Sequence, residues 1–303
     1  MTTTLEETTD VCPACGARCA DGDRFCEDCG ASLTGEITPA AVPDRCQLDL
    51  GTLAAVTDRG KRHAHNEDAM ALRVLDGTRI LVVCDGVSSS EHAADAAQRA
   101  ATTAADRLAA ELGAGLGAEA ATILAIGAAA EAVAALGDRG ELTPSCTIVT
   151  AAVTATAVTV GSIGDSRAYW LTTDLAATPP RRLSIDDSVA SGLVDLGVDE
   201  VTAMSMPHAH TLTAWLGADA EGVEPHLRTF VPDGPGAVLL CSDGLWNYYP
   251  DAAALTALAL PSGLTDPRAA AHQLADLALA AGGGDNITVA VAPFPALSRN
   301  DRS

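Results

Sequence analysis

The sequence predicts an α+β protein in which helices cover both faces of a layered sheet structure, in the order α/β/β/α. Two observations support this fold class. Short segments rich in β-branched residues recur along the chain, as is typical of strands. Two long Ala-rich segments, 93–112 and 118–136, are separated by Gly113, Gly115 and Gly117, which is the pattern of a helix pair. Strands grouped around paired helices form such layers.

The regular part of the chain runs from residue 47 to residue 296 and is assigned to one large domain. The expected strands are residues 53–58, 69–75, 79–84, 146–153, 156–162, 167–171, 237–241 and 286–293. The further expected helices are residues 250–258 and 266–281, with short helical pieces near 187–196. The first three strands surround an Asp-Gly turn at residues 76–77. Most of the segment 172–236 is expected to be irregular.

The charge of the chain excludes several classes of partner. The 303 residues include 18 Lys and Arg against 40 Asp and Glu, a formal charge of −22. Such a surface repels phosphate backbones and anionic membranes, so neither nucleic acid nor a membrane is expected as a partner. Only 3% of the residues are aromatic, which also argues against a base-stacking platform.

The chain has an uncharged stretch, residues 142–164, that is long enough to cross a bilayer. It contains six Thr and two Ser and is broken by Pro144 and Gly161, so a β-hairpin is the better interpretation. The N-terminus MTTTLEETTD has neither a basic nor an apolar region of a signal peptide. These features predict a cytoplasmic location.

A cysteine-rich unit near the N-terminus predicts a structural zinc site. Cys12 and Cys15 form one CxxC pair, Cys26 and Cys29 form another, and ten residues separate the pairs. Four thiolates in this spacing can enclose one tetrahedral Zn²⁺, although buried or redox-active cysteines are the alternative. The unit resembles small zinc ribbons, and its acidic residues favour a protein as its partner over a nucleic acid.

This unit sets the organisation of the N-terminal part of the chain. Residues 1–10 are expected to be disordered, and residues 11–33 to form the zinc ribbon. Residues 34–46 carry two prolines without periodicity and are expected to be a linker, and residues 297–303 a flexible tail.

Four short acidic motifs stand near the ends of expected strands. They are NED at 66–68, CDG at 84–86, SDG at 242–244 and GDN at 284–286. Each is weak alone, because Asp-Gly is an ordinary turn. Several carboxylates that converge at strand ends would form a hard-oxygen site suited to Mg²⁺ or Mn²⁺. A pair of such ions can clamp a phosphoryl group during in-line attack.

The motifs and their order resemble those of the metal-dependent type 2C protein serine/threonine phosphatases, over residues ~50–293. The segments that carry the resemblance are DRGKRHAHNEDA, VVCDGV, PSCTIV, GSIGDSRAYW, LLCSDGLW and GGGDNITVAV. The resemblance implies a central sandwich of two antiparallel sheets flanked by helix pairs. It also implies hydrolysis of phosphoserine and phosphothreonine on proteins, by a water or hydroxide that bridges two Mn²⁺ or Mg²⁺ ions, with a third ion bound more weakly.

The resemblance also implies roles around the second metal ion. Asp85 matches the carboxylate that bridges both ions, and the Gly86 carbonyl matches a ligand of the second. Glu67 matches an acidic residue at the second ion. Asp68 matches a catalytic residue that orients water at the metals.

Similar roles follow for the other ions. Asp243 and Asp285 match ligands of the first ion, and Asp165 matches a ligand of the weaker third ion, which it shares with Asp243. Asn286 is expected to organise the site from beside Asp285.

The chain departs from the family pattern where the substrate phosphate is bound. The family places an Arg four residues before the Glu of NED, but this position is His63 here, with Arg62 beside it. Either side chain could bind phosphate, or His63 could be a surface residue.

Two alternatives to a protein phosphatase therefore stay open: a catalytically weak adaptor that binds a phosphoprotein or another partner, and a phosphatase for small metabolites. The implied partners are phosphorylated proteins, including Ser/Thr kinases or their substrates.

Overall fold

The computed structural model describes residues 44–295, except 89, 91, 138–142, 175–177, 221–223 and 261. The segments predicted to be disordered (1–10), a zinc ribbon (11–33) and a C-terminal tail (297–303) lie outside the described residues, as does most of the predicted linker (34–46). Strand β1 begins at Arg45, inside the segment predicted to be a linker.

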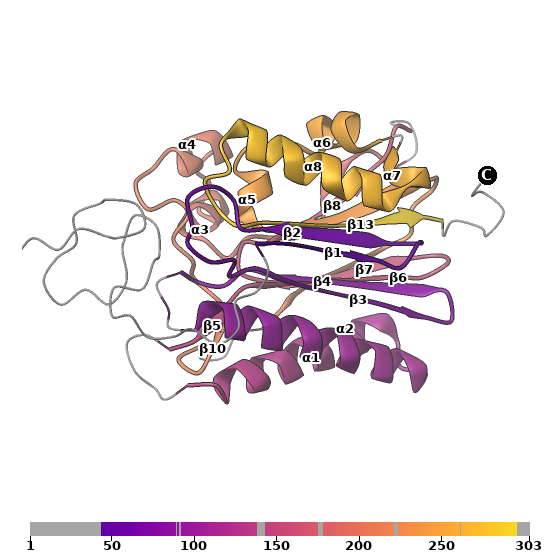
Figure 1. Ribbon diagram of the computed structural model, residues 1–303, viewed down its shortest axis with the longest axis horizontal. Coiled ribbons are helices and arrows are strands. Elements are labelled where there is room, and N and C mark those ends of the chain that lie inside the picture. The colour runs from indigo at the N-terminus through magenta and orange to yellow at the C-terminus, as the bar shows by residue number, and fades with distance from the viewer. Residues whose placement is uncertain are drawn as a thin grey trace, which may run out of the picture.

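Two antiparallel sheets lie face to face, and helices cover the outer face of each (Figure 1). Helices α1 (Ala93–Gly113) and α2 (Ala118–Ala134) cover one sheet. Helices α6 (Ala252–Ala259), α7 (Ser262–Thr265) and α8 (Pro267–Ala281) cover the other. The predicted four-layer order α/β/β/α is confirmed.

Within the described residues, the first sheet has the strand order β1-β2-β13-β12-β8-β9, and every neighbouring pair is antiparallel. Its strands are β1 (Arg45–Asp49), β2 (Ala54–Asp58), β8 (Arg167–Leu171), β9 (Arg181–Arg182), β12 (Gly236–Cys241) and β13 (Ile287–Phe294). Strand β13 is the latest in the sequence, yet it lies between β2 and β12 near the middle of the sheet.

The second sheet, in the part of the chain that is described, has the order β11-β7-β6-β4-β3 and is also antiparallel. Its strands are β3 (Ala69–Leu75), β4 (Thr78–Cys84), β6 (Ile148–Val153), β7 (Val158–Ile163) and β11 (His226–Phe230). Strands β6 and β7 form the hairpin predicted for the uncharged stretch. None of the helices in the described residues is long and apolar enough to cross a membrane.

The alternation of side chains along the strands builds the core on both sides of each sheet. On β4, Ile80 and Val82 pack against the α1–α2 pair, whereas Leu81 and Val83 pack between the two sheets. Small Ala side chains on the buried faces of α1 and α2 let these helices approach each other and the sheet closely.

One predicted strand is interrupted. Residues 146–153 form β5 (Ser145–Cys146) and β6, separated by Thr147. The Thr147 amide still donates to the Asp85 carbonyl (2.7 Å), but the Asp85 amide donates to the Thr147 side chain, Oγ1 (3.1 Å), instead of to a backbone carbonyl, so the regular ladder between β4 and β6 ends at this point. Strand β5 pairs instead with β10 (Leu216–Gly217).

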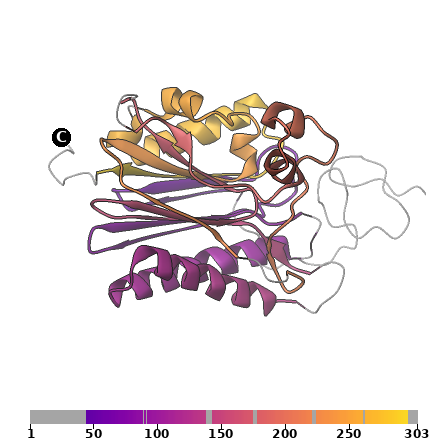
Figure 2. The same cartoon turned by 180° about the vertical axis from the view of Figure 1, so that it is seen from behind.

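The segment predicted to be irregular, 172–236, contains β9, β10, β11, α3 (Val189–Asp195) and α4 (Glu200–Met204). Helix α3 coincides with the helical pieces expected near 187–196. Figures 1 and 2 place α3 and α4 at the same end of the sandwich as α5 (Asp243–Trp246).

Candidate active site

The predicted acidic residues come from strand ends that the two sheets bring together. In the second sheet, Ala69 at the start of β3 pairs with Cys84 at the end of β4, so Glu67, Asp68 and Asp85 are neighbours. In the first sheet, Cys241 at the end of β12 pairs with Val289 near the start of β13, which places the segments of Asp243 and Asp285 side by side.

Hydrogen bonds connect these two groups across the sandwich. The Ser242 hydroxyl donates to Asp68 Oδ2 (2.7 Å) and accepts from the Thr288 amide (2.9 Å). Asn286 Oδ1 accepts from the Glu67 amide (2.7 Å), and its Nδ2 donates to the carbonyls of Arg59 (2.8 Å) and His65 (3.0 Å). Asn286 thus holds the 59–67 loop against the start of β13.

Two glycines allow the backbones of the site to approach this closely. A Cβ on Gly86 would lie 2.8 Å from the carbonyl oxygens of both Glu67 and Ala93. A Cβ on Gly244 would lie 2.0 Å from the Asn286 carbonyl oxygen. Real Cβ atoms do not approach backbone so closely, so the second residue of each Asp-Gly pair is needed for packing as well as for a turn.

Asp85 is fixed by a residue that the sequence analysis did not single out. The Asp85 amide donates to Thr147 Oγ1 (3.1 Å), which also lies 2.7 Å from Ser166 Oγ. Ser166 follows Asp165 in the turn between β7 and β8, so Thr147 joins two acidic positions. The only sequence signal for Thr147 and Ser242 was their presence inside the PSCTIV and CSDG motifs.

Most of the acidic side chains are buried and lie close together, and their pKa values are raised. Burial raises the pKa of Asp68 to about 7, and repulsion by Asp285 adds to this. Burial, followed by repulsion from Asp186, raises the pKa of Asp165 to about 7. Burial and then the neighbouring carboxylates raise the pKa of Asp85 and of Asp243 well above the ordinary range, and burial raises that of Glu67. The site therefore carries more negative charge than it can stabilise alone.

This arrangement fits divalent cations. The buried oxygens Glu67 Oε2, Asp68 Oδ1 and Asp243 Oδ1 have no hydrogen-bond partner, which is rare for carboxylates unless a cation satisfies them. No group of three or more His, Cys, Asp and Glu side chains in the described residues is arranged to hold a metal ion as it stands. Ions here would thus need backbone carbonyl and water ligands as well, as Mg²⁺ normally does.

The two candidate phosphate-binding residues differ in position. His63 Nε2 lies 3.1 Å from Asp285 Oδ1, and its side chain is 20% exposed. Its carbonyl accepts a hydrogen bond from Arg59 Nη1. Arg62, the next residue back, is exposed. Of the two, His63 therefore faces the acidic cluster.

Comparisons with known proteins agree with this fold and site. The family model described as protein phosphatase 2C matches residues 57–278. The chain is 34% identical over 245 residues to the serine/threonine protein phosphatase PstP of Mycobacterium tuberculosis, a match that covers 79% of this chain and 44% of the relative. The chain therefore spans less than half of that relative's length. It belongs to the protein phosphatase 2C family.

Solved structures extend the comparison. A bacterial serine phosphatase aligns with a TM-score of 0.69 and 25% identity, over 81% of this chain and 98% of that one. The catalytic domain of PstP, solved in complex with two manganese ions, aligns with a TM-score of 0.59 and 27% identity, over 82% and 99% of the two chains.

Proposed function

We propose that this chain is a metal-dependent protein phosphatase that hydrolyses phosphoserine and phosphothreonine on proteins. The observation that carries the proposal is the cluster of acidic side chains at one end of the sandwich, with three buried oxygens that lack partners. Membership of the protein phosphatase 2C family supports the same reaction. Divalent ions in such a cluster neutralise phosphoryl oxygens and lower the pKa of water towards ~7.

The residues that would hold the ions are those that surround the partnerless oxygens. The proposed ligands are Glu67, Asp85, the Gly86 carbonyl, Asp165, Asp243 and Asp285. We propose two Mn²⁺ or Mg²⁺ ions and a weaker third, because burial and then repulsion by the neighbouring carboxylates raise the pKa values of Asp85 and Asp243 when no ion is present.

Two neighbours act on the reaction without being ligands. Asp68 accepts from Ser242 through one oxygen and keeps the other, Oδ1, without a partner. That oxygen is available to accept a hydrogen bond from the attacking water and so to orient it. Asn286 holds the Glu67 backbone in place through its side-chain amide.

Phosphate binding is assigned to His63, with Arg62 as the alternative. The contact of His63 Nε2 with Asp285 supports this choice, because the ring already faces the cluster, whereas Arg62 is exposed. An imidazole offers a single contact where an arginine offers a two-bond fork, so substrate is held less tightly than by an arginine at this position.

The test is hydrolysis of a phosphothreonine peptide and of a small aryl phosphate, with and without Mn²⁺. Asp243→Asn should abolish both activities, whereas Glu119→Gln, an exposed carboxylate on α2, should leave both unchanged. Absence of Mn²⁺-dependent hydrolysis in the unaltered protein, despite Mn²⁺ binding, would favour the phosphoprotein-binding adaptor. Activity on the aryl phosphate alone would favour a metabolite phosphatase.

We further propose that residues 11–33 form a zinc ribbon held by Cys12, Cys15, Cys26 and Cys29, and that it contacts protein partners or substrates. Metal analysis should find one zinc per chain, which the double change Cys26→Ser and Cys29→Ser should remove. Deletion of residues 1–43, which leaves β1 intact, should weaken action on a protein substrate and spare the aryl phosphate. The cytoplasmic location stays a prediction, which cell fractionation can check.

A further inference from the structure

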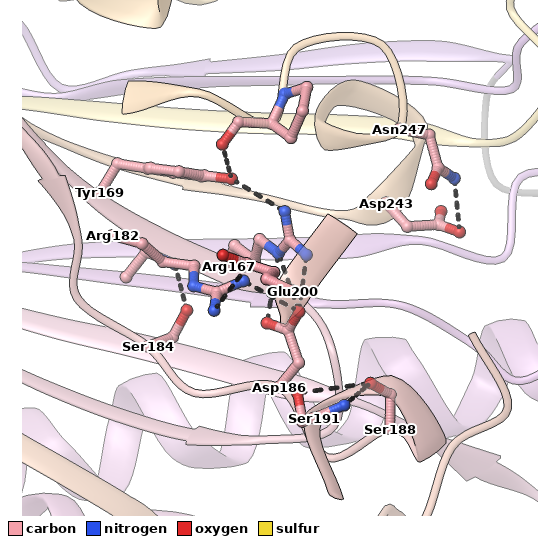
Figure 3. A network of polar contacts seen from close by, with 12 residues as sticks. Arg167, Tyr169, Arg182, Ser184, Asp186, Ser188, Ser191, Glu200, Asp243 and Asn247 are labelled. Atoms are coloured by element: carbon pink, nitrogen blue, oxygen red, sulfur yellow. Dashed lines mark hydrogen bonds and ion pairs between the residues drawn. The ribbon is translucent and has the colours of Figure 1, made fainter. Parts of the chain in front are cut away.

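Arg167 on β8 lies behind the candidate metal ligands, in a buried ion pair that the proposed reaction does not use. Its Nε lies 3.0 Å and 3.2 Å from the two carboxylate oxygens of Asp186, and its Nη2 lies 2.6 Å from Asp186 Oδ2. The two side chains are 3% and 4% exposed. Figure 3 shows Asp186 reached by Arg167 on one side and by Arg182 on the other.

The same guanidinium also contacts α5. Its Cζ atom lies over the Trp246 ring, 3.7 Å from the ring centroid. Trp246 is the last residue of the single-turn helix that begins with Asp243, so this contact fixes the helix that carries a proposed metal ligand. Arg167 Nη1 also lies 3.4 Å from the Tyr169 hydroxyl, which donates to the Pro250 carbonyl beyond the end of α5 (3.2 Å).

A third connection runs to the turn that carries Asp165. Asp165 is two residues before Arg167 in the chain. The Gly164 amide donates to Asp187 Oδ2 (2.8 Å), and the Asp187 amide donates to the Gly164 carbonyl (2.9 Å). Asp187 is thus hydrogen-bonded to the turn that carries Asp165, and the preceding residue, Asp186, binds Arg167.

We propose that Arg167 is a positioning residue that sets the separation between Asp165 and Asp243, the two side chains expected to share the weaker third ion. The inference rests on the proposed function and deepens it. Arg167 joins the start of β8, two residues after Asp165, to the helix that begins with Asp243 through one rigid group. The segment that leads into α3 is tied to the same group through Asp186.

The chemistry of arginine explains why this residue serves that purpose. A buried ion pair is costly to desolvate and is weak support for stability alone, so its value here lies in geometry. Only a planar guanidinium can form a two-bond fork with a carboxylate and stack on an indole at the same time. A lysine would keep the charge and lose both constraints. Groups behind metal ligands typically change metal affinity by roughly tenfold or more when they are removed.

The experiment measures Mn²⁺ binding to the full-length protein by calorimetry, with thermal melts as a check on folding. Arg167→Met and Arg167→Lys should keep the affinity of the tighter ions and weaken the last, weaker binding event by roughly tenfold. Trp246→Phe, which leaves an aromatic ring, should weaken the same event to a smaller extent. The control is Arg73→Met, which removes an exposed arginine that forms a similar fork to Asp106 on α1 and should change nothing.

Three results would overturn the proposal. The first is an unchanged affinity of the weakest Mn²⁺ binding step in Arg167→Met. The second is full retention of that affinity in Arg167→Lys. The third is a wild-type isotherm that shows no weaker binding step. If Arg167→Met fails to fold, the lysine and Trp246→Phe variants decide the question. Failure of the proposed function is distinguishable, because it would appear as absent hydrolysis in the wild-type protein whatever its Mn²⁺ binding.

Discussion

Replacing Asp68 with Asn should stabilise the metal-free protein at alkaline pH. Asp68 is 2% exposed, and burial raises its pKa from an ordinary value of 3.8 to about 7. A carboxyl whose pKa is raised by folding favours the folded state at low pH. That contribution is lost as pH rises from about 4 to about 7, because the folded protein must then ionise a group that resists ionisation. An amide at this position has no such cost.

The size of the effect follows from the contacts of Asp68. At pH values above 7, the difference between the two pKa values corresponds to about 4 kcal/mol. The hydrogen bond that Ser242 donates to the carboxylate at 2.7 Å lowers this pKa and is therefore already contained in that figure. The expected gain is therefore up to about 4 kcal/mol, which corresponds to about 8–16 °C in Tm for a domain of this size.

The assay is thermal unfolding with a chelator present, at several pH values from 4.5 to 8.5. We expect the gain at pH 8 to shrink and vanish as pH approaches 4–5. Glu119→Gln removes an exposed carboxylate of α2 and should show no such pH-dependent gain. A lower Tm for Asp68→Asn at pH 8, or a gain that is equal at all pH values, would refute the argument from buried charge.

Three further changes test other parts of the molecule. Gly244→Ala should lower stability by about 3 kcal/mol or more and reduce Mn²⁺ binding, because its Cβ would lie 2.0 Å from the Asn286 carbonyl oxygen. Denaturant unfolding measures the stability and calorimetry measures the Mn²⁺ binding. A variant in which neither quantity changes would contradict the packing argument. Arg79→Met should raise the free energy of unfolding by about 1–3 kcal/mol. Arg79 lies between the sheets at 1% exposure, its Nε and Nη2 have no partner, and burial lowers its pKa to about 10. A lower denaturation midpoint in the variant would show that the guanidinium is satisfied. His63→Arg should lower KM for a phosphothreonine peptide about tenfold, since a guanidinium binds phosphate through two bonds, and an unchanged KM would transfer phosphate binding to Arg62.

The central strands and the long helices could be predicted from sequence because their signals are local. Residues 69–75 and 167–171 were expected as strands and match β3 and β8. Strand β8 lies inside its sheet, and β3, although it is at the edge of its sheet, buries its first four residues. The missed strands include the two-residue strands β9 and β10 and two five-residue strands, β1 and β11, which are edge strands with largely exposed residues. Edge strands need little apolar alternation, and their pairing with β2 and β7 decides their conformation.

The candidate site divides in a similar way. The acidic residues could be singled out because each lies in a short motif at a strand end. The contacts that hold them could not, because they depend on how the two sheets stack. The hydrogen bond from Ser242 to Asp68 joins residues that are 174 positions apart. The contact of Arg167 with Trp246 joins the start of β8 to the end of α5. Periodicity and motif spacing contain no information on such pairs.

The position of β13 in the first sheet has a consequence for biosynthesis. Among the strands in the described residues, β1 and β2 are made first, but they can join β12 and β8 only through β13, which is made after the others. Asp285 and Asn286 directly precede that strand, so the loop of residues 59–67 also lacks its anchor until then. A ribosome-bound chain that has not yet released residue 294 can therefore fold the α1–α2 layer and the second sheet, but it cannot assemble the acidic cluster. Any metal-dependent activity would begin only once β13 has emerged from the ribosome and joined β2 and β12.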